Sequence, residues 1–292
     1  MQLNYKELAR KSWYSAWHNK LLWLFGLFLV IGVEGGNYQG FNFDFSEKFA
    51  EMTKSGYLIS VFLGFAVLIA IFLVGVVCQA ALIKGVQNLS LGIKNNFKQL
   101  WAFGKTKFKK ILMADLILGL LFLIAIAPIF LSRLESFLVM ALLSLWFLAL
   151  IVGFVFFGNY FYYFFAYLVL EDKNLKTAAL LAWRLFRDNA KISIFTSFIR
   201  IGFAIAVGIG IFIISYLLAV IFSAFGYLLF VALGSSGVII AAFLGALVVW
   251  VASLAVYSFI NTFYYIFSLY VYFQLTGRNV APVVPGSPKK VE

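Results

Sequence analysis

Few side chains in this sequence have the chemistry that catalysis or metal binding requires. The chain contains one histidine, His18, and one cysteine, Cys78, far apart in the sequence. No His or Cys cluster has metal-ligand spacing, and no phosphate-binding loop or nucleophile motif occurs. His18 stands beside Asn19 and Lys20 in a basic amphipathic stretch, which is typical of a membrane-interface residue rather than a general base. The sequence therefore predicts a protein that is not an enzyme and that has no cofactor or metal.

Two charged residues, Asp115 and Arg200, stand inside long apolar segments. Charges at such positions usually face the protein interior and often mark function. If both segments are helices that enter from one side, Asp115 lies about 8 Å and Arg200 about 14 Å beyond the last flanking lysine. An arginine side chain can bridge that difference. We consider two interpretations: the residues form an intramembrane ion pair, or each side chain extends separately to the membrane surface.

Other polar or small residues also interrupt the apolar segments. Asn159 and Asn261 are expected to form hydrogen bonds across helices, with contact to a substrate as the alternative. Gly202, Ala206 and Gly210 are spaced four residues apart, which allows another helix to approach closely. That helix would belong to the same bundle or to a second copy of the chain.

The composition is that of a membrane protein. Hydrophobic residues make up 64% of the chain and charged residues 12%, with a mean hydropathy of +1.01. About 20 apolar residues cross a bilayer, and backbone groups inside lipid must pair within their own segment, so these segments should be helices. The sequence predicts an all-α polytopic membrane bundle of six transmembrane helices, at residues 21–33, 57–83, 111–131, 137–170, 192–229 and 238–273.

The six segments fall into three similar units. Each unit begins with a basic, Trp-containing amphipathic stretch and continues with two apolar segments, so that the repeats cover about 5–83, 91–170 and 175–273. Together they form one predicted integral membrane domain, 1–276, followed by a Pro-rich tail, 277–292, expected to be disordered and cytoplasmic. The amphipathic stretches are interpreted as elbows between spans or as a rim that binds lipid or a partner. Their expected interfacial anchors are Trp13, Trp101 and Trp183.

The positive charge is unevenly distributed. Most of the 23 Lys and Arg residues lie in the termini and in the loops on the same predicted side. The positive-inside rule then places both termini in the cytoplasm. The formal net charge of +12 is interpreted as this topology signal together with attraction to anionic lipid headgroups. No nucleic-acid-binding module is present, so nucleic acid is not an expected partner.

Three segments resemble a known family. YLVLED at 167–172, AALLAWRLFRDN at 178–189 and SWYSAWHNKLLWLFG at 12–26 are similar to the membrane domain of glycerophosphodiester phosphodiesterases and its uncharacterised bacterial six-span relatives. The resemblance extends from Lys6 to about Phe273 and implies a multi-pass protein of a prokaryotic plasma (inner) membrane. In those enzymes a separate soluble barrel performs catalysis. No catalytic residue is therefore carried over to this chain.

These observations lead to two functional expectations. The first is a non-enzymatic membrane module whose amphipathic rim engages membrane lipids, a protein partner or a second copy of the chain. The alternative is a transporter or channel for a small solute or lipid, favoured by the repeats and by Asp115 and Arg200 but opposed by the scarcity of polar residues. A polar cavity touching Asp115, Asn159, Arg200 or Asn261 would favour transport, and a dry bundle with a basic rim would favour the module.

Overall fold

The computed structural model describes residues 3–32, 54–129 and 137–278, and the secondary-structure elements within these ranges are all helices. The expected tail lies outside the described residues from residue 279 onward. The helices are α1 (Tyr5–His18), α2 (Lys20–Gly32), α4 (Lys54–Ser90), α5 (Phe97–Ile126), α6 (Phe137–Leu170), α7 (Leu175–Asp188), α8 (Ala190–Leu233) and α9 (Ser235–Leu275).

Four described segments are long and apolar enough to cross a membrane, so the chain is a helical membrane protein. They are Phe62–Ser90, Phe97–Ile129, Ala190–Val231 and Ser235–Leu275. Helix α6 adds a fifth span if its halves, Leu138–Gly153 and Val155–Leu170, which are bent by 44°, count as one. The expected first span, 21–33, corresponds to α2, whose apolar part, Lys20–Ile31, is shorter than a usual span.

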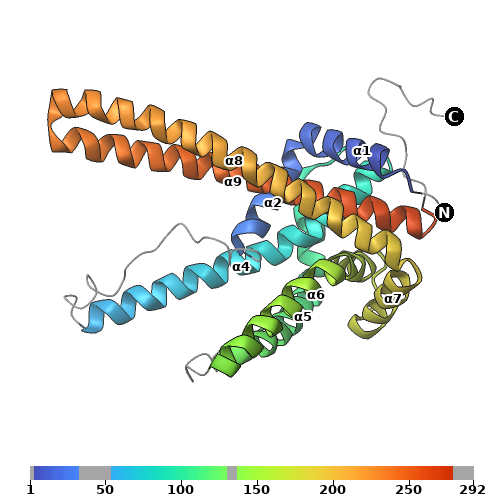
Figure 1. Ribbon diagram of the computed structural model, residues 1–292. Coiled ribbons are helices and arrows are strands. Elements are labelled where there is room, and N and C mark those ends of the chain that lie inside the picture. The colour runs from blue at the N-terminus through green and yellow to red at the C-terminus, as the bar shows by residue number, and fades with distance from the viewer. Residues whose placement is uncertain (1–2, 33–53, 130–136, 279–292) are drawn as a thin grey trace.

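The helices form three arms that diverge from a common base (Figure 1). Helices α8 and α9 lie side by side in the longest arm, α5 and α6 form a second, and the first half of α4 extends as a third. Helices α1 and α7 lie at the base, together with the end of α9. The arms expose many large apolar side chains, including Phe62, Phe212 and Phe243. Exposed apolar surfaces of this extent are typical of helices surrounded by lipid or by another protein.

Helix α8 is one continuous helix of 44 residues, without a break at Gly226. Its length of about 66 Å exceeds the hydrocarbon thickness of a bilayer. The chain reverses at Gly234, whose φ of +66° is accessible to glycine at little cost. Beyond this turn Gly237 lies directly against the backbone of Leu229, and Gly226 faces Ala241. These small residues bring α8 and α9 together near the tip of the arm.

The protein core is concentrated at the base. Tyr163 of α6 and Tyr270 and Tyr272 of α9 are fully buried there. Helix α2 packs against α9: the hydroxyl of Ser258 donates to the carbonyl of Trp23, and Thr262 is bonded to the backbone of the same helix. The buried phenol and hydroxyl groups find partners in this region, which allows the base to pack tightly.

The amphipathic stretches of the first and third units are separate helices of the same construction. Helices α1 and α7 each have 14 residues. Asn4 caps the first by accepting from a backbone N–H, and Asn174 caps the second in the same way. Each helix is followed by an asparagine, Asn19 or Asn189, whose side-chain amide donates to the carbonyl four residues earlier. These asparagines provide matched breaks before α2 and α8.

The second unit departs from this pattern. Its stretch, capped by Asn96, continues without interruption into the apolar part of α5. Lysines rather than an asparagine precede the apolar segment here, so no side chain replaces the backbone hydrogen bonds that a helix end would lose. The predicted amphipathic stretch at the start of α5 is therefore part of one longer helix.

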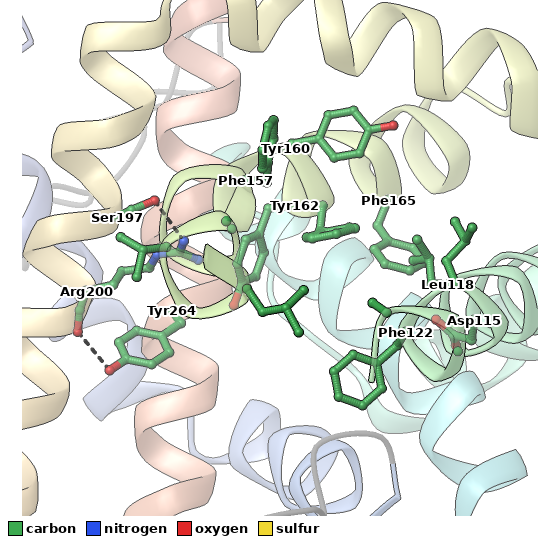
Figure 2. Close-up of a pocket in the computed structure, with 18 of the residues that line it drawn as sticks. Asp115, Leu118, Phe122, Phe157, Tyr160, Tyr162, Phe165, Ser197, Arg200 and Tyr264 are labelled. Atoms are coloured by element: carbon green, nitrogen blue, oxygen red, sulfur yellow. Dashed lines mark hydrogen bonds between the residues drawn. The ribbon is translucent and has the colours of Figure 1, made fainter. Parts of the chain in front are cut away.

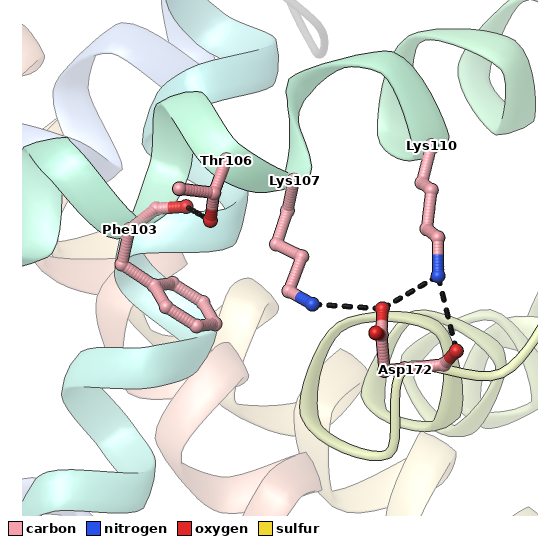
Figure 3. A network of polar contacts seen from close by, with 5 residues as sticks. All are labelled: Phe103, Thr106, Lys107, Lys110 and Asp172. Carbon is pink, nitrogen blue, oxygen red and sulfur yellow. Dashed lines mark hydrogen bonds and ion pairs between the residues drawn. The ribbon is translucent and has the colours of Figure 1, made fainter.

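The corner between α6 and α7 is held by two adjacent carboxylates. Asp172, with φ of +56°, accepts from the ammonium groups of Lys107 and Lys110 of α5 at 2.7 and 2.5 Å (Figure 3). Its neighbour Glu171 accepts from the phenol of Tyr272 at 2.6 Å and from Arg278 at 2.7 Å. The corner thereby joins α6 to α5 and to the end of α9.

The small-residue face of α8 receives no other helix among the described residues. A Cβ built at Gly202 or at Gly210 meets nothing within 4 Å in the described structure. The interpretation that these residues pack within the bundle is therefore wrong for the described helices. The arms diverge at this level, so that face of α8 has no neighbour in the part of the chain that the structure describes.

Candidate functional site

A cavity of about 1140 Å³ lies where the arms diverge from the base. Residues of α4, α5, α6, α7, α8 and α9 line it, and most of them are apolar or aromatic. Two of them, Leu121 and Phe122, are 57% and 47% exposed, so the cavity reaches the outer surface of the helices. A space of this kind suits a largely apolar ligand that enters from the bilayer.

Small residues and a bend keep this space open. Gly119 of α5 and Gly153 of α6 both line the cavity, and a Cβ at either position would meet no atom within 4 Å. The 44° bend of α6 follows Gly153 directly. The bend turns the outer half of α6 away from the axis of its inner half. Because Gly119 and Gly153 have no side chains, no atoms project from these two positions into the cavity.

Arg200 of α8 is the basic residue of the cavity wall. Its guanidinium lies over the ring of Tyr162, 4.6 Å from the ring centroid, which is a cation–π contact. It also donates to the hydroxyls of Ser197 and Ser268, both at a long 3.4 Å. Gly158 makes room for it, since a Cβ there would stand 2.7 Å from one of its terminal nitrogens. The guanidinium Nε is buried and has no hydrogen-bond partner among the described residues.

Hydrogen bonds that join α6 and α9 to α8 form a polar seam beside Arg200. The side-chain amide of Asn159 donates to the carbonyl of Ser193 and, at 3.2 Å, to the hydroxyl of Ser197. The phenol of Tyr264 donates to the carbonyl of Arg200 at 3.0 Å (Figure 2). The predicted hydrogen bonds of Asn159 across helices are confirmed. This seam holds Ser197, and through it Arg200, in place.

Two further acceptors line the cavity, one on α4 and one on α5. Gln79 is 2% exposed, and Asp115 stands on the adjacent helix. Both line the cavity. The Oε1 atom of Gln79 and the Oδ2 atom of Asp115 are buried and have no donor among the described residues. Buried acceptors without donors are rare in proteins.

Asp115 and Arg200 line the same cavity but do not form the expected ion pair. None of the ion pairs between described residues includes either side chain. Figure 2 shows them on opposite sides, with aromatic side chains of α6, among them Tyr162, between them. The reason is that α6 packs between α5 and α8 and separates the two charges.

Asn261 of α9 differs from the expectation of a hydrogen bond across helices. It is 2% exposed, and neither atom of its side-chain amide has a partner within the described parts of the chain. It does not line the cavity.

The three predicted tryptophan anchors have different surroundings. Trp183 of α7 is 42% exposed, lines the cavity, and stacks on Phe157 with ring centroids 6.1 Å apart. Trp13 of α1 is 43% exposed and packs edge-to-face on Phe259 of α9. Trp101 of α5 is partly buried and stacks on a ring of its own helix. Trp183 thus connects the amphipathic helix α7 with the cavity.

His18 and Cys78 are both accounted for by local structure. Ring nitrogen Nδ1 of His18 lies 2.9 Å from the carbonyl of Tyr14, and the two rings stack. Cys78 is a buried free thiol. Across residues 3–32, 54–129 and 137–278, no three His, Cys, Asp or Glu side chains gather into a group that could hold a metal ion.

Sequence reasoning did not single out Gln79, Tyr162 or Ser197. Gln79 stands beside Cys78 in an apolar segment, and a polar residue at such a position can be recognised from the sequence as a candidate site residue. Tyr162 and Ser197 give no comparable signal, because tyrosine and serine are common in membrane helices. Their role follows from the contacts with Arg200.

Comparisons with protein-family models, with curated proteins and with solved structures found no match to this chain.

Proposed function

We propose that this chain is a non-enzymatic membrane module that binds a lipid-like amphiphile in the cavity between its arms. The observation that carries the proposal is a large apolar cavity with an arginine in its wall that has no carboxylate partner among the described residues. An apolar wall accommodates acyl chains, and a guanidinium binds the phosphate or carboxylate of a headgroup through parallel hydrogen bonds.

The surroundings of Arg200 support an anionic ligand. Tyr162, Ser197 and Ser268 hold the guanidinium but do not neutralise it. An uncompensated charge inside the hydrocarbon region is costly. Its buried Nε is also left without an acceptor within the described residues. An anionic group in the cavity would supply both the counter-charge and the acceptor.

The depth of the site is compatible with a lipid headgroup. Arg200 lies about 14 Å along α8 from Lys191, at the 1.5 Å rise of an α-helix. Trp183 lines the same cavity from the amphipathic helix α7, and tryptophans of such helices favour the headgroup region. A headgroup entering beside α7 would reach Arg200 while its chains remain between the arms.

The topology proposed with this function has six spans, three repeats and both termini in the cytoplasm of a prokaryotic plasma membrane. The matched construction of α1–α2 and α7–α8 supports internal repetition. The basic residues of α1, α7 and the start of α5 support the orientation. The basic rim would also attract anionic headgroups to the entrance. The resemblance to the membrane domain of glycerophosphodiester phosphodiesterases remains a prediction.

The alternative function is transport of a small solute or lipid. The cavity touches Asp115 and Arg200, which favours it, but not Asn159 or Asn261. A flux assay in liposomes distinguishes the two functions. Transport predicts flux of the bound compound that Arg200→Gln abolishes, and a binding module predicts retention without flux.

The direct test is native mass spectrometry of the chain extracted in native lipid discs. We expect an anionic lipid to remain bound, and Arg200→Gln to lower its occupancy at least about tenfold, as loss of a charge-assisted hydrogen bond implies. Arg184→Gln on the exposed face of α7 is the matched control and should retain the lipid. Equal occupancy in both variants would show that the cavity is not the lipid site. A protein partner or second copy at fixed stoichiometry, without bound lipid, would make the chain an accessory subunit.

A further inference from the structure

Besides Arg200, the cavity contains two buried oxygen atoms that lack a hydrogen-bond donor within the described part of the chain. Gln79 and Asp115 reach the cavity from two adjacent helices, and each presents a buried oxygen that accepts no hydrogen bond from the described residues. Gln79 is 2% exposed, so solvent does not replace the missing donor. Neither oxygen is satisfied within the described chain, so each requires a donor that the described residues do not provide.

Two lysines that precede Asp115 on α5 do not meet this requirement. Lys107 and Lys110 direct their ammonium groups to Asp172 at the α6–α7 corner (Figure 3). Arg200 stands across the cavity and is engaged with Tyr162 and Ser197. Asp115 therefore has no cationic partner within residues 3–32, 54–129 and 137–278, although a carboxylate at low dielectric favours a cationic donor over a neutral one.

The two walls are separated by an apolar middle. In Figure 2 Arg200 and Ser197 lie on one side and Asp115 on the other, while aromatic side chains such as Tyr162 and Phe165 stand between them. A ligand that satisfies both walls must carry an acceptor at one end, a donor at the other, and an apolar stretch in between.

We infer that the cavity binds a bipolar amphiphile, with an anionic group at Arg200 and an ammonium group at Asp115. This inference rests on the proposed function and deepens it, since it specifies the second polar group of the ligand. Its competitor is a protonated Asp115, which would leave no requirement for an ammonium.

The test compares two probes of equal chain length, dodecanoate and ω-aminododecanoate, which differ only in the terminal ammonium. Their affinities for the purified full chain in detergent are measured by native mass spectrometry. We expect the amino probe to bind at least about tenfold more tightly, as a charge-assisted hydrogen bond implies. Asp115→Asn should abolish this preference without changing the affinity for dodecanoate. Asp188→Asn, on exposed α7, is the control and should keep it.

Each outcome separates the inference from the proposed function. Equal binding of the two probes to the native chain would overturn the bipolar ligand and leave anionic lipid binding intact. Failure of both probes and of anionic lipid to bind would overturn both proposals. A preference that persists in Asp115→Asn would place the ammonium elsewhere and overturn the inference. If that variant does not fold, Asp115→Ser takes its place and should likewise abolish the preference.

Discussion

At the scale of single residues, the α6–α7 corner shows how one exposed carboxylate can connect distant segments. Asp172 accepts from Lys107 and Lys110, which belong to a helix more than sixty positions earlier. These hydrogen bonds and the two ammonium charges lower the pKa of Asp172 to about 2. Its side chain is 62% exposed, so solvent screens the attraction and the contribution to stability is small.

We predict that Asp172→Asn lowers the melting temperature in detergent by about one or two degrees, because an exposed ion-pair network contributes little. Asp188→Asn is the control, since its contact with Arg187 is longer, at 3.4 Å, and exposed. Fluorescence-detected melting measures both variants. A larger drop in melting temperature for Asp188→Asn than for Asp172→Asn would contradict the conclusion that Asp172 joins the α6–α7 corner to α5.

The same residue predicts a pH dependence with a definite sign. The pKa of Asp172 is about 2 in the folded chain, below its ordinary 3.8. Its contribution is therefore complete well above pH 3.8 and is lost as the pH falls from 3.8 toward about 2. We expect the difference in melting temperature between the native chain and Asp172→Asn to be constant near neutral pH and to vanish in acid. A difference that grows in acid would contradict this.

At the scale of helices, the contact between α4 and α5 depends on one missing side chain. Gly104 lies directly against the carbonyl oxygen of Val77, and a Cβ there would also stand 2.9 Å from a Val77 methyl group. The backbone of α4 cannot move aside without shifting its buried neighbours. This close approach sets how α4 and α5 cross at the base.

We predict that Gly104→Ala destabilises the protein by about 1–3 kcal/mol, the usual cost of overpacking, despite the better helix propensity of alanine. Gly64→Ala in the exposed half of α4 is the matched control, since nothing lies within 4 Å of a Cβ there. Unfolding in a denaturing detergent measures both free energies. If Gly64→Ala lowered the free energy of unfolding as much as Gly104→Ala, the effect would come from replacing a helical glycine and not from the contact with Val77.

At the scale of the whole molecule, the arms and the base have different environments. The base buries its side chains in protein, whereas the arms present large apolar side chains such as Leu68, Phe212 and Val251 outward. The turn at Gly234 and the helix α7 lie at opposite ends of the structure (Figure 1). A bilayer crossed by the arms would therefore separate them.

We predict that cysteines introduced at these two ends react on opposite sides of the membrane. In a Cys78→Ala background, Ser236→Cys at the tip of the long arm should react with an impermeant maleimide in intact cells. Lys176→Cys on α7 should react only after permeabilisation. Both positions are exposed. Labelling of Lys176→Cys in intact cells would reverse the proposed orientation, and labelling of both would contradict the span count.

The sequence by itself determined the helical membrane class, because apolar runs of this length can satisfy their backbone in lipid only as helices. It also identified Asp115 and Arg200, since a charge in an apolar segment is visible without any structure. It did not determine that the two charges lie on opposite walls, that Gln79 also lines the cavity, or that Tyr162 and Ser197 hold Arg200. Those relations depend on how the helices cross at Gly104 and diverge beyond it. Such contacts join distant positions through packing geometry, which hydrophobic periodicity does not encode.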